Sequence, residues 1–537
     1  MIRKILYTFT VVAFFQSNAQ QPDLSFGTNG KVMTSFGPKP SILATIALQT
    51  DGKILACGSY FTYTTSPFFV GNEVALSRYN IDGSPDINFG TQGKVIIPIG
   101  SDTENENNTV SVLNDGKILI LANNTVRISQ FERRSEYTLI KYNADGSPDS
   151  GFGNNGIASI RYDGHSNWAR TMAIQPDNKI VLVGNSEQIN GFDYGNFVAV
   201  RLNADGSKDS GFGDNGRVDY NVGTVFNNSD PTEDNSQSVA IQADGKILIG
   251  GGNNNTTGFG SSGAALMRLN ANGTLDTAFG NNGRARISIG SYTSVNRIQL
   301  LPDGKIIGSG VNFYNDNNNE KIIVFKCQSN GVLDATFGNE GKVVIDDGND
   351  DPVFFSLASI LQSDGKILVS GWGNKDEHFD AFVVRLNIDG SNDSDFGNNG
   401  YLWSGLGQDM IANDLLLQND GKLLIGGTTT NGNTANEFIL WRYDDVNLTS
   451  RQFDEAKFKV SPNPFQNMIN IDFKMTKDEF LSFELIDQTG RKIQQLYSGN
   501  FNIGQNSQQL QMPQLPKGIY FLNISGRQIS KTIKIIN

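Results

Sequence analysis

Acidic turns are the first residues in this sequence whose types and spacing could do chemistry. The turn Asn143–Asp149 (NADGSPD) has the spacing of the last part of a calcium-binding loop, whose oxygen ligands alternate along the chain to surround the ion. In these turns a cation, such as Lys141 or Arg201, occupies the place of the first carboxylate. A cation supplies neither the charge nor the oxygen that calcium requires, so we interpret Asp145 and Asp205 as residues that hydrogen-bond within their own turns.

An isolated acidic cluster, Ile345–Pro352 (IDDGNDDP), is the stronger metal candidate because it holds four carboxylates. Such charge runs are usually solvated loops, so we expect no cofactor, with calcium as the alternative. His165 and His378 lie in separate repeats and are too few for a His-rich metal site or a Ser-His-Asp triad. We assign no catalytic residue, although a carboxylate-pair hydrolase or lyase stays open because pair separation cannot be read from sequence. The four candidate metal ligands are Asp346, Asp347, Asp350 and Asp351.

The charge balance argues against a nucleic-acid partner. The chain has 43 basic and 55 acidic residues, a net charge of −12, whereas nucleic-acid phosphates require a clustered basic face. The two cysteines, Cys57 and Cys327, each end an apolar run, which favours buried free thiols over a disulfide. The stability of the fold must then come from packing.

The N-terminus has the pattern of a secretory signal peptide. Arg3 and Lys4 precede an apolar run, Ile5–Phe15, and Ser17–Ala19 forms a small-x-small cleavage site. We therefore predict that residues 1–19 are a signal peptide. The apolar run is too short to span a bilayer, and we expect no transmembrane segment elsewhere.

Two short sequence motifs, called phrases below, recur at matching intervals along the chain and define a repeat of roughly 60 residues. The first, D-x-x-F-G-x-x-G, begins at Asp23, Asp86, Asp149, Asp209, Asp276, Asp334 and Asp393. The second, D-G-K or once D-N-K, begins at Asp51, Asp115, Asp177, Asp244, Asp303, Asp364 and Asp420.

Each copy contains four short strands rich in Ile, Leu and Val. In the first copy we place them at Lys31–Met33, Thr45–Gln49, Lys53–Cys57 and Val74–Tyr79. The D-G-K segments predict tight turns whose last residue is left-handed, a conformation open to Gly and also to Asn178 in the third copy. Seven such units predict an all-β fold, a closed seven-bladed β-propeller, with a linear β-solenoid as the alternative.

The lengths of the connections suggest where a ligand binds. Connections of fixed and variable length alternate, so in antiparallel blades the variable loops share one face, on which we expect recognition. The Phe of each F-G pair, such as Phe212, is expected to plug the space between units. The first variable loop, Gly58–Glu73, is aromatic and would suit a glycan or a protein, unless its rings tuck under the loop. These ligand-face candidates are Tyr60, Phe61, Tyr63, Phe68 and Phe69.

The repeat resembles the delta-60 repeat family of bacterial β-propellers. The resemblance rests on the L-N-x-D-G-x-x-D-x-x-F-G phrase, as in Leu202–Gly213, and on the D-G-K turn, and it covers about Gln21–Asp445. It implies a propeller fold for residues 20–446 and no agreed biochemical activity.

After a polar linker at residues 447–457, alternating apolar residues predict a small Ig-like β-sandwich at residues 458–537. This tail resembles the type A C-terminal sorting domain of the type IX secretion system of Bacteroidetes. The resemblance implies transport across the outer membrane by the secretion machinery, removal of the tail, and release or attachment to surface lipopolysaccharide. The matching motif residues are Pro462, Asn463, Pro464, Gly490, Gly518 and Tyr520.

The sequence therefore predicts an extracellular or surface-exposed protein, exported through the periplasm. We expect a non-catalytic binding or scaffold module for a polysaccharide or a protein. The alternative is an extracellular hydrolase or lyase that uses carboxylates in the propeller channel.

Overall fold

The computed structural model of the chain describes two compact units, Met1–Asn447 and Leu448–Asn537, which we treat separately. Within the described ranges the chain forms strands and turns, and no helix there is long and apolar enough to cross a membrane. The described residues are 20–63, 70–99, 108–127, 133–162, 165–188, 196–222, 232–255, 263–287, 293–313, 320–345, 355–375, 378–405, 409–429, 436–444, 458–475, 478–487, 492–526 and 530–537.

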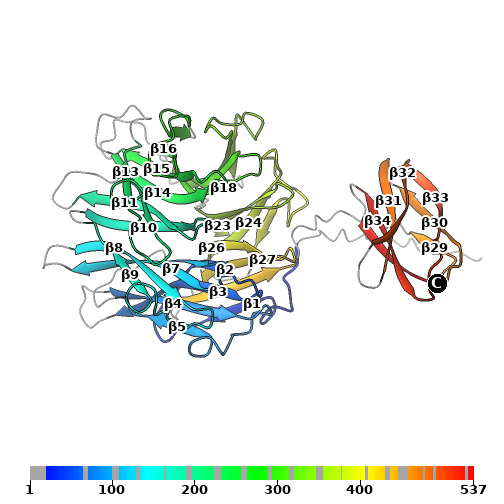
Figure 1. Cartoon of the computed structure of the whole chain (residues 1–537), viewed down its shortest axis with the longest axis horizontal. Helices are drawn as coiled ribbons and strands as arrows, with labels where there is room; N and C mark the ends of the chain where they lie inside the picture. Colours follow the sequence, from blue (N-terminus) through cyan, green and yellow to red (C-terminus); the bar gives the residue numbers. More distant parts are fainter. Residues whose placement is uncertain are drawn as a thin grey trace, which may run out of the picture. The chain divides into compact units, whose positions relative to one another are not determined.

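The described part of the first unit contains seven antiparallel sheets of four strands each (Figure 1). The first is β2 (Ser41–Leu48), β3 (Ile54–Tyr63), β4 (Val70–Tyr79) and β5 (Lys94–Ile97). The second is β6 (Thr109–Val112), β7 (Ile118–Arg127), β8 (Arg133–Tyr142) and β9 (Ile157–Ile160). The third is β10 (His165–Ile174), β11 (Ile180–Gln188), β12 (Asn196–Leu202) and β13 (Arg217–Tyr220). The fourth is β14 (Thr232–Ile241), β15 (Ile247–Asn255), β16 (Gly263–Leu269) and β17 (Arg284–Ile287).

The remaining three sheets follow in chain order. The fifth is β18 (Thr293–Leu300), β19 (Ile306–Phe313), β20 (Glu320–Cys327) and β21 (Lys342–Ile345). The sixth is β22 (Phe355–Leu361), β23 (Ile367–Lys375), β24 (His378–Leu386) and β25 (Tyr401–Trp403). The seventh is β26 (Met410–Leu417), β27 (Leu423–Thr429), β28 (Glu437–Tyr443) and the N-terminal strand β1 (Lys31–Thr34).

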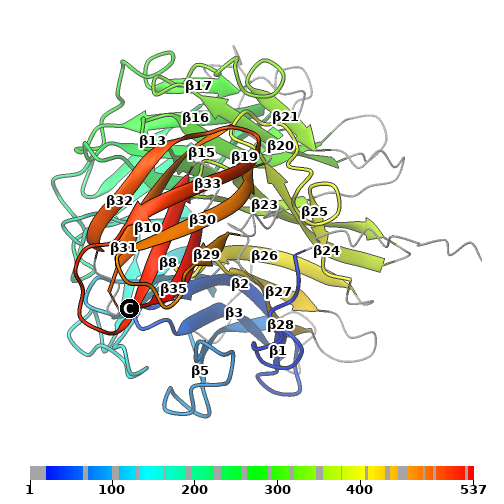
Figure 2. The same cartoon turned by 90° about the vertical axis from the view of Figure 1, so that its right-hand side faces the viewer.

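The seven sheets close into a ring around their first strands. Strand β2 contacts β6, and the contacts continue through β10, β14, β18, β22 and β26 back to β2. The colours follow the same order around the ring in Figure 2. These first strands are therefore innermost, which could not be read from the sequence, and the β-propeller prediction is confirmed.

The blade is offset by one strand from the sequence repeat. Lys31–Met33, predicted as the first strand of the first unit, lies in β1 and pairs with β28 of the last sheet. The strands β2, β3 and β4 are completed by β5, which comes from the following repeat. The assignment of all four strands of a copy to one sheet was therefore wrong, because the ring is closed by pairing its N-terminal strand with its last hairpin.

The predicted turns have the expected backbone. Asn178, which replaces the usual Gly of the D-G-K turn, has φ 65°, in the left-handed region that Asn tolerates. Fixed turns join the first strand to the second and the third to the fourth, whereas the variable connections leave from the opposite strand ends. The two kinds of connection therefore lie on opposite faces of the ring, as predicted.

The D-x-x-F-G phrase holds a buried ion pair within its blade and a buried ring against the next blade. Nε of Arg201 donates to Oδ2 of Asp209 at 2.7 Å, and its guanidinium lies over Phe212, 4.7 Å from the ring centroid. Arg201 also donates to the carbonyl oxygen of Ala271 in the next blade, where Phe212 packs against Gly273. A Cβ atom on Gly273 would lie 2.9 Å from Val218 and 3.0 Å from the Phe212 ring, so the contact requires glycine. The predicted Phe plug is confirmed.

The same connection closes the ring. Asp23, from the first copy of the phrase, accepts hydrogen bonds from Arg442 at 2.8 Å and from Lys422 at 2.5 Å, both in the last sheet. The two cysteines take no part in closure, since Cys57 and Cys327 are buried free thiols, as expected. The fold is thus held by packing and by repeated ion pairs.

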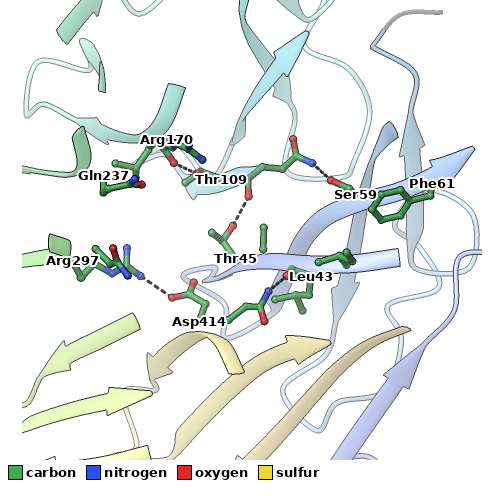
Figure 3. A pocket seen from close by; sticks show the side chains of 15 residues that line it. Leu43, Thr45, Ser59, Phe61, Thr109, Arg170, Gln237, Arg297 and Asp414 are labelled. Atoms are coloured by element: carbon green, nitrogen blue, oxygen red, sulfur yellow. Dashed lines mark hydrogen bonds and ion pairs between the residues drawn. The ribbon is translucent and has the colours of Figure 1, made fainter. Parts of the chain in front are cut away.

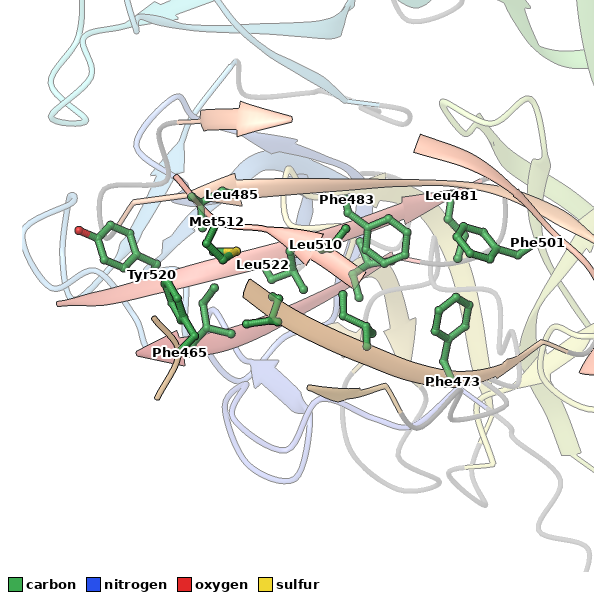
Figure 4. Packing of buried hydrophobic residues seen from close by; sticks show 14 of the residues in the cluster. Phe465, Phe473, Leu481, Phe483, Leu485, Phe501, Leu510, Met512, Tyr520 and Leu522 are labelled. Atoms are coloured by element: carbon green, nitrogen blue, oxygen red, sulfur yellow. The ribbon is translucent and has the colours of Figure 1, made fainter. Parts of the chain in front are cut away.

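The second unit is a small β-sandwich with its own core (Figure 4). Aromatic and aliphatic side chains from both sheets fill it, and the ring centroids of Phe473 and Phe483 lie 6.2 Å apart across it. One sheet contains β29 (Lys459–Ser461), β30 (Met468–Met475) and β33 (Gly504–Gln511). The other contains β31 (Glu479–Ile486), β32 (Lys492–Phe501), β34 (Ile519–Gly526) and β35 (Ser530–Ile536).

Candidate functional site

The innermost strands share an irregularity that shapes the channel. In six of them the pairing register skips one residue, which forms a β-bulge. The bulged residue lies seven positions before the Asp of the following turn, as Ala44 does before Asp51, and Asn108 holds this position beside β6. A bulge re-aims side chains, and residues at or beside this position in six of the seven blades line the cavity described next. The bulge positions are Ala44, Asn108, Arg170, Gln237, Asn296, Leu357 and Asn413.

A cavity of about 460 Å³ lies among these bulges (Figure 3). Its lining is mostly hydroxyl, amide and charged groups, with a few apolar side chains from β2 and β3. This volume falls within the usual range of small-molecule sites, about 300–1,000 Å³. The lining residues are Ile42, Leu43, Ala44, Thr45, Ser59, Phe61, Asn108, Thr109, Arg170, Thr171, Gln237, Asn296, Arg297, Asn413 and Asp414.

An ion pair crosses one side of this cavity. Nη2 of Arg297 donates to Oδ1 of Asp414 at 2.7 Å, which joins β18 to β26 past the intervening β22 (Figure 3). Asp414 also accepts backbone hydrogen bonds from Ile46 and Leu415, each at 3.0 Å. Burial raises the pKa of the Asp414 carboxyl, and Arg297 and the backbone donors oppose that rise. A buried carboxyl with a shifted pKa beside a cation is a common mark of a functional site.

Asp414 occupies a position that several other blades give to Thr or Ser. The residue after the bulge accepts a hydrogen bond from the next innermost strand, as Thr45 does from the backbone N–H of Val110 at 3.0 Å. Ser238 accepts from Ile298 in the same way, also at 3.0 Å. Asp414 therefore keeps a structural bond between blades and adds a charge that binds Arg297.

The aromatic residues predicted to form a ligand face in the first variable loop have different environments in the structure. β3 and β4 extend to Tyr63 and Val70, so the predicted loop Gly58–Glu73 is largely a hairpin, because its backbone continues to pair. Tyr60 is 8% exposed and packs in a core cluster, which leaves little of its ring for a ligand, whereas Phe61 lines the cavity. The side chain of Tyr63, and residues Phe68 and Phe69, lie outside the described part.

The predicted metal cluster is also outside the described residues, since Asp346, Asp347, Asp350 and Asp351 fall in the gap at 346–354. In the part of the chain that the structure describes, no group of three or more His, Cys, Asp or Glu side chains could hold a metal ion. His165 and His378 begin β10 and β24 and lie in different sheets.

The acidic turns have the geometry that we inferred from their sequence. Oδ1 of Asp145 accepts from the backbone N–H of Ser147 at 2.9 Å, and Asp205 accepts from Ser207 at the same distance. The hydrogen bond from the Ser207 hydroxyl lowers the pKa of Asp205. Both carboxylates therefore bond within their own turns, and Arg201 binds Asp209.

The sorting-motif residues of the tail gather beside its C-terminal strand β35. Asn463 accepts from the backbone N–H of Ile536 at 2.8 Å and donates to the carbonyl oxygen of Lys534 at 3.1 Å. Gly518 exchanges backbone hydrogen bonds with Asn537, and Tyr520 donates to the Pro516 carbonyl oxygen at 2.9 Å. Pro462 and Pro464 flank Asn463, whereas Gly490 lies outside the described residues.

Two family models match the chain. The model described as a domain of unknown function (DUF5122) β-propeller matches residues 49–89, 175–212, 242–279, 301–337, 362–396 and 418–445. The model of the secretion system C-terminal sorting domain matches residues 459–537. The chain is a β-propeller of DUF5122 repeats with a secretion sorting tail. The sorting tail implies interaction with the secretion machinery and export to the cell surface or the extracellular space.

The likenesses between this propeller and solved structures are distant. A protein of unknown function from Dyadobacter fermentans is 10% identical, with a TM-score of 0.40, over 78% of this chain and 98% of that one. An α-L-arabinanase from Penicillium chrysogenum is 11% identical, with a TM-score of 0.34, over 75% and 93%. An intramolecular trans-sialidase from Ruminococcus gnavus is 10% identical, with a TM-score of 0.34, over 78% and 95%. These scores are too low to bear on function, and no curated protein matches the sequence.

Proposed function

We propose that this protein is a secreted or cell-surface binding module whose propeller holds a saccharide in the cavity among its innermost strands, without catalysing a reaction. Residues 1–19 act as the signal peptide, and the tail delivers the propeller across the outer membrane. The observation that carries the proposal is the polar cavity of about 460 Å³ at the centre of the ring.

The chemistry of the lining favours a saccharide. Hydroxyl and amide groups such as Thr45, Thr109, Gln237 and Asn413 offer donors and acceptors to sugar hydroxyl groups, and Phe61 adds an apolar ring. The volume suits one or two sugar rings and excludes a folded protein partner, which could insert only a loop. The cavity lies toward the variable-loop end of β2, near its start at Ser41, as expected for a recognition face.

Binding is favoured over carboxylate-pair hydrolysis because the described residues of the lining include one carboxylate, Asp414. Glycoside hydrolysis ordinarily requires two carboxyl groups on opposite sides of the scissile bond. Asp414 accepts hydrogen bonds from Arg297, Ile46 and Leu415, so its oxygens are committed to protein donors. A group held in this way is suited to positioning and less suited to attack.

An oligosaccharide array, combined with a variant that fills the cavity, tests the proposal. We expect the purified protein to bind a subset of neutral or acidic oligosaccharides, and Ala44→Phe, at a lining bulge, to abolish that binding. Ala204→Phe is the matched control, because Ala204 is exposed in a turn away from the lining. Equal binding by both variants, or release of new reducing ends from bound sugars, would contradict a non-catalytic cavity site.

The delivery part of the proposal has its own test. Deletion of residues 458–537 should leave the propeller in the periplasm, because the sorting tail is the part that the secretion machinery reads. Accumulation of the truncated protein in the periplasm, measured by fractionation and surface proteolysis, is the expected result. A truncated protein that still reached the surface would show that delivery does not depend on the tail.

A further inference from the structure

Two guanidinium groups line the cavity of an otherwise acidic protein. The described lining residues include Arg170, Arg297 and one carboxylate, Asp414, whereas the whole chain has a net charge of −12. Walls of low dielectric focus the field of charges that line a cavity, so these two arginines matter more there than on the open surface. An anionic group on the ligand would accept hydrogen bonds from their N–H donors.

Arg297 is held in place and still has donors to offer. Its contact with Asp414 uses Nη2, and a guanidinium carries five N–H donors in a rigid fork. The Arg297 side chain is 37% exposed, whereas that of Asp414 is 7% exposed. Asp414 therefore anchors the arginine from behind, while part of the guanidinium faces the cavity.

Arg170 faces the same cavity from another blade. It holds the bulge position of β10, and Figure 3 shows it beside Gln237 and Thr109, across the cavity from the Arg297–Asp414 pair. Thr109 donates to the backbone carbonyl oxygen of Arg170 at 3.4 Å, which ties the bulge to the neighbouring innermost strand. A positioned guanidinium next to a hydroxyl and an amide matches an acidic group on a hydroxyl-rich molecule.

We infer that the ligand of the cavity is an acidic saccharide, whose anionic oxygens are bound by Arg170 and Arg297 while its hydroxyl groups contact the surrounding amides and hydroxyls. This inference rests on the proposed saccharide-binding function and names its ligand class. Carboxylate and sulfate groups share the chemistry, since both present oxygens that a guanidinium binds through two donors.

Titration calorimetry with matched sugars tests the charge requirement on the unmodified protein. The probes are tri-galacturonic acid, its methyl ester, neutral galactotriose, a sulfated galactose trisaccharide and an oligoglutamate peptide. We expect the acid or the sulfated sugar to bind at least 10-fold more tightly than the ester and the neutral sugar, with an affinity that falls as salt rises. The comparison of acid with ester needs no variant and therefore does not depend on a variant folding.

Arginine variants test the assignment of residues. Arg170→Met should weaken binding of the acidic sugar about 10- to 100-fold and remove its preference over the neutral sugar, and Arg297→Lys should weaken binding of the acidic sugar about 10-fold because the planar fork of donors is lost. The matched control is Arg161→Met, since Arg161 lies outside the cavity and pairs with Glu136. Tryptophan fluorescence verifies that each variant is folded.

The outcomes separate the two proposals. Equal, arginine-independent binding of acidic and neutral sugars would overturn the acidic-saccharide inference and leave saccharide binding standing. Failure of every sugar to bind, or binding of oligoglutamate alone through the two arginines, would overturn both.

Discussion

Substitution of Asp209 by Asn tests how much the repeated ion pair stabilises the propeller. Burial acts to raise the pKa of Asp209, but hydrogen bonds from Lys179, from the backbone N–H of Gly211 and from Arg201 outweigh it and lower the pKa to about 2. The ionised carboxylate is therefore more stable in the folded protein than in the unfolded chain. Asn keeps the shape of the side chain and removes its charge.

The size of the effect follows from that pKa. A decrease of roughly 2 units corresponds to about 2.5 kcal/mol of stability at pH 7, and solvent around Lys179, which is about one-third exposed, reduces this contribution. The substitution also leaves the buried guanidinium of Arg201 without its carboxylate, which adds a cost of about 1 kcal/mol. We expect Asp209→Asn to lower the free energy of unfolding by about 2 kcal/mol at pH 7.

Urea denaturation followed by tryptophan fluorescence measures this change, because all four tryptophans lie in the propeller. The matched control is Asp205→Asn, which should change stability by less than about 0.5 kcal/mol. An Asn already makes the same turn bond elsewhere, where Asn272 accepts from the backbone N–H of Thr274 at 3.1 Å. The control therefore changes the same residue type in the same repeat, away from the ion pair.

The dependence of the stability difference on pH can refute the ion-pair argument. The stabilisation is complete above the unfolded pKa of Asp, 3.8, and is lost as the pH falls through about 2, so wild type and Asp209→Asn should converge between about pH 5 and pH 2. Equal stability of wild type and variant at pH 7, or a difference that does not change with pH, would refute the ion-pair argument.

Three further predictions follow from the same structure. Phe212→Ala should lower the free energy of unfolding by about 3–4 kcal/mol, because its ring is fully buried between blades, whereas Leu24→Ala, at a side chain 72% exposed, should change it by less than about 0.5 kcal/mol in the same urea assay. Burial raises the pKa of Asp414, so the stability of wild type relative to Asp414→Asn should fall as pH rises through that pKa, opposite in sign to Asp209; parallel urea titrations across pH measure this. Asn463→Ala removes two hydrogen bonds to β35 and should speed amide exchange at Ile536 about 10-fold or more, measured by hydrogen exchange.

Features encoded by short stretches of sequence could be predicted. The D-G-K turns, the left-handed Asn178 and the buried ring of Phe212 each depend on residues within one repeat, whose chemistry permits few alternatives. The order of the repeats also predicted a closed ring. The sorting tail carried an equally local motif around Asn463.

Features that join distant segments could not be predicted. Nothing near Lys31 shows that its strand pairs with β28 at the far end of the chain, because backbone pairing carries little side-chain information. A signal for the ion pairs was present, since a cation precedes the motif Asp by eight residues in most copies, as Arg201 precedes Asp209. From the sequence, that cation was used only to argue against calcium binding, and its pairing with Asp209 was not predicted.

The cavity is lined by positions whose residue type differs from one repeat to the next. The motif Asp pairs with its cation inside a blade, and the cation and the Phe reach the next blade, as Asp209, Arg201 and Phe212 show, so a change at any of them would weaken the ring. The residue type at the bulge position is not constrained in this way, because a bulge can direct the side chain out of the sheet toward the channel. This position therefore holds residues as different as Ala44, Arg170 and Asn413 in one chain. A ring of seven near-identical blades can bind an asymmetric ligand only through positions that vary in this way; Arg170 holds one of them, and Arg297 directly follows another, Asn296.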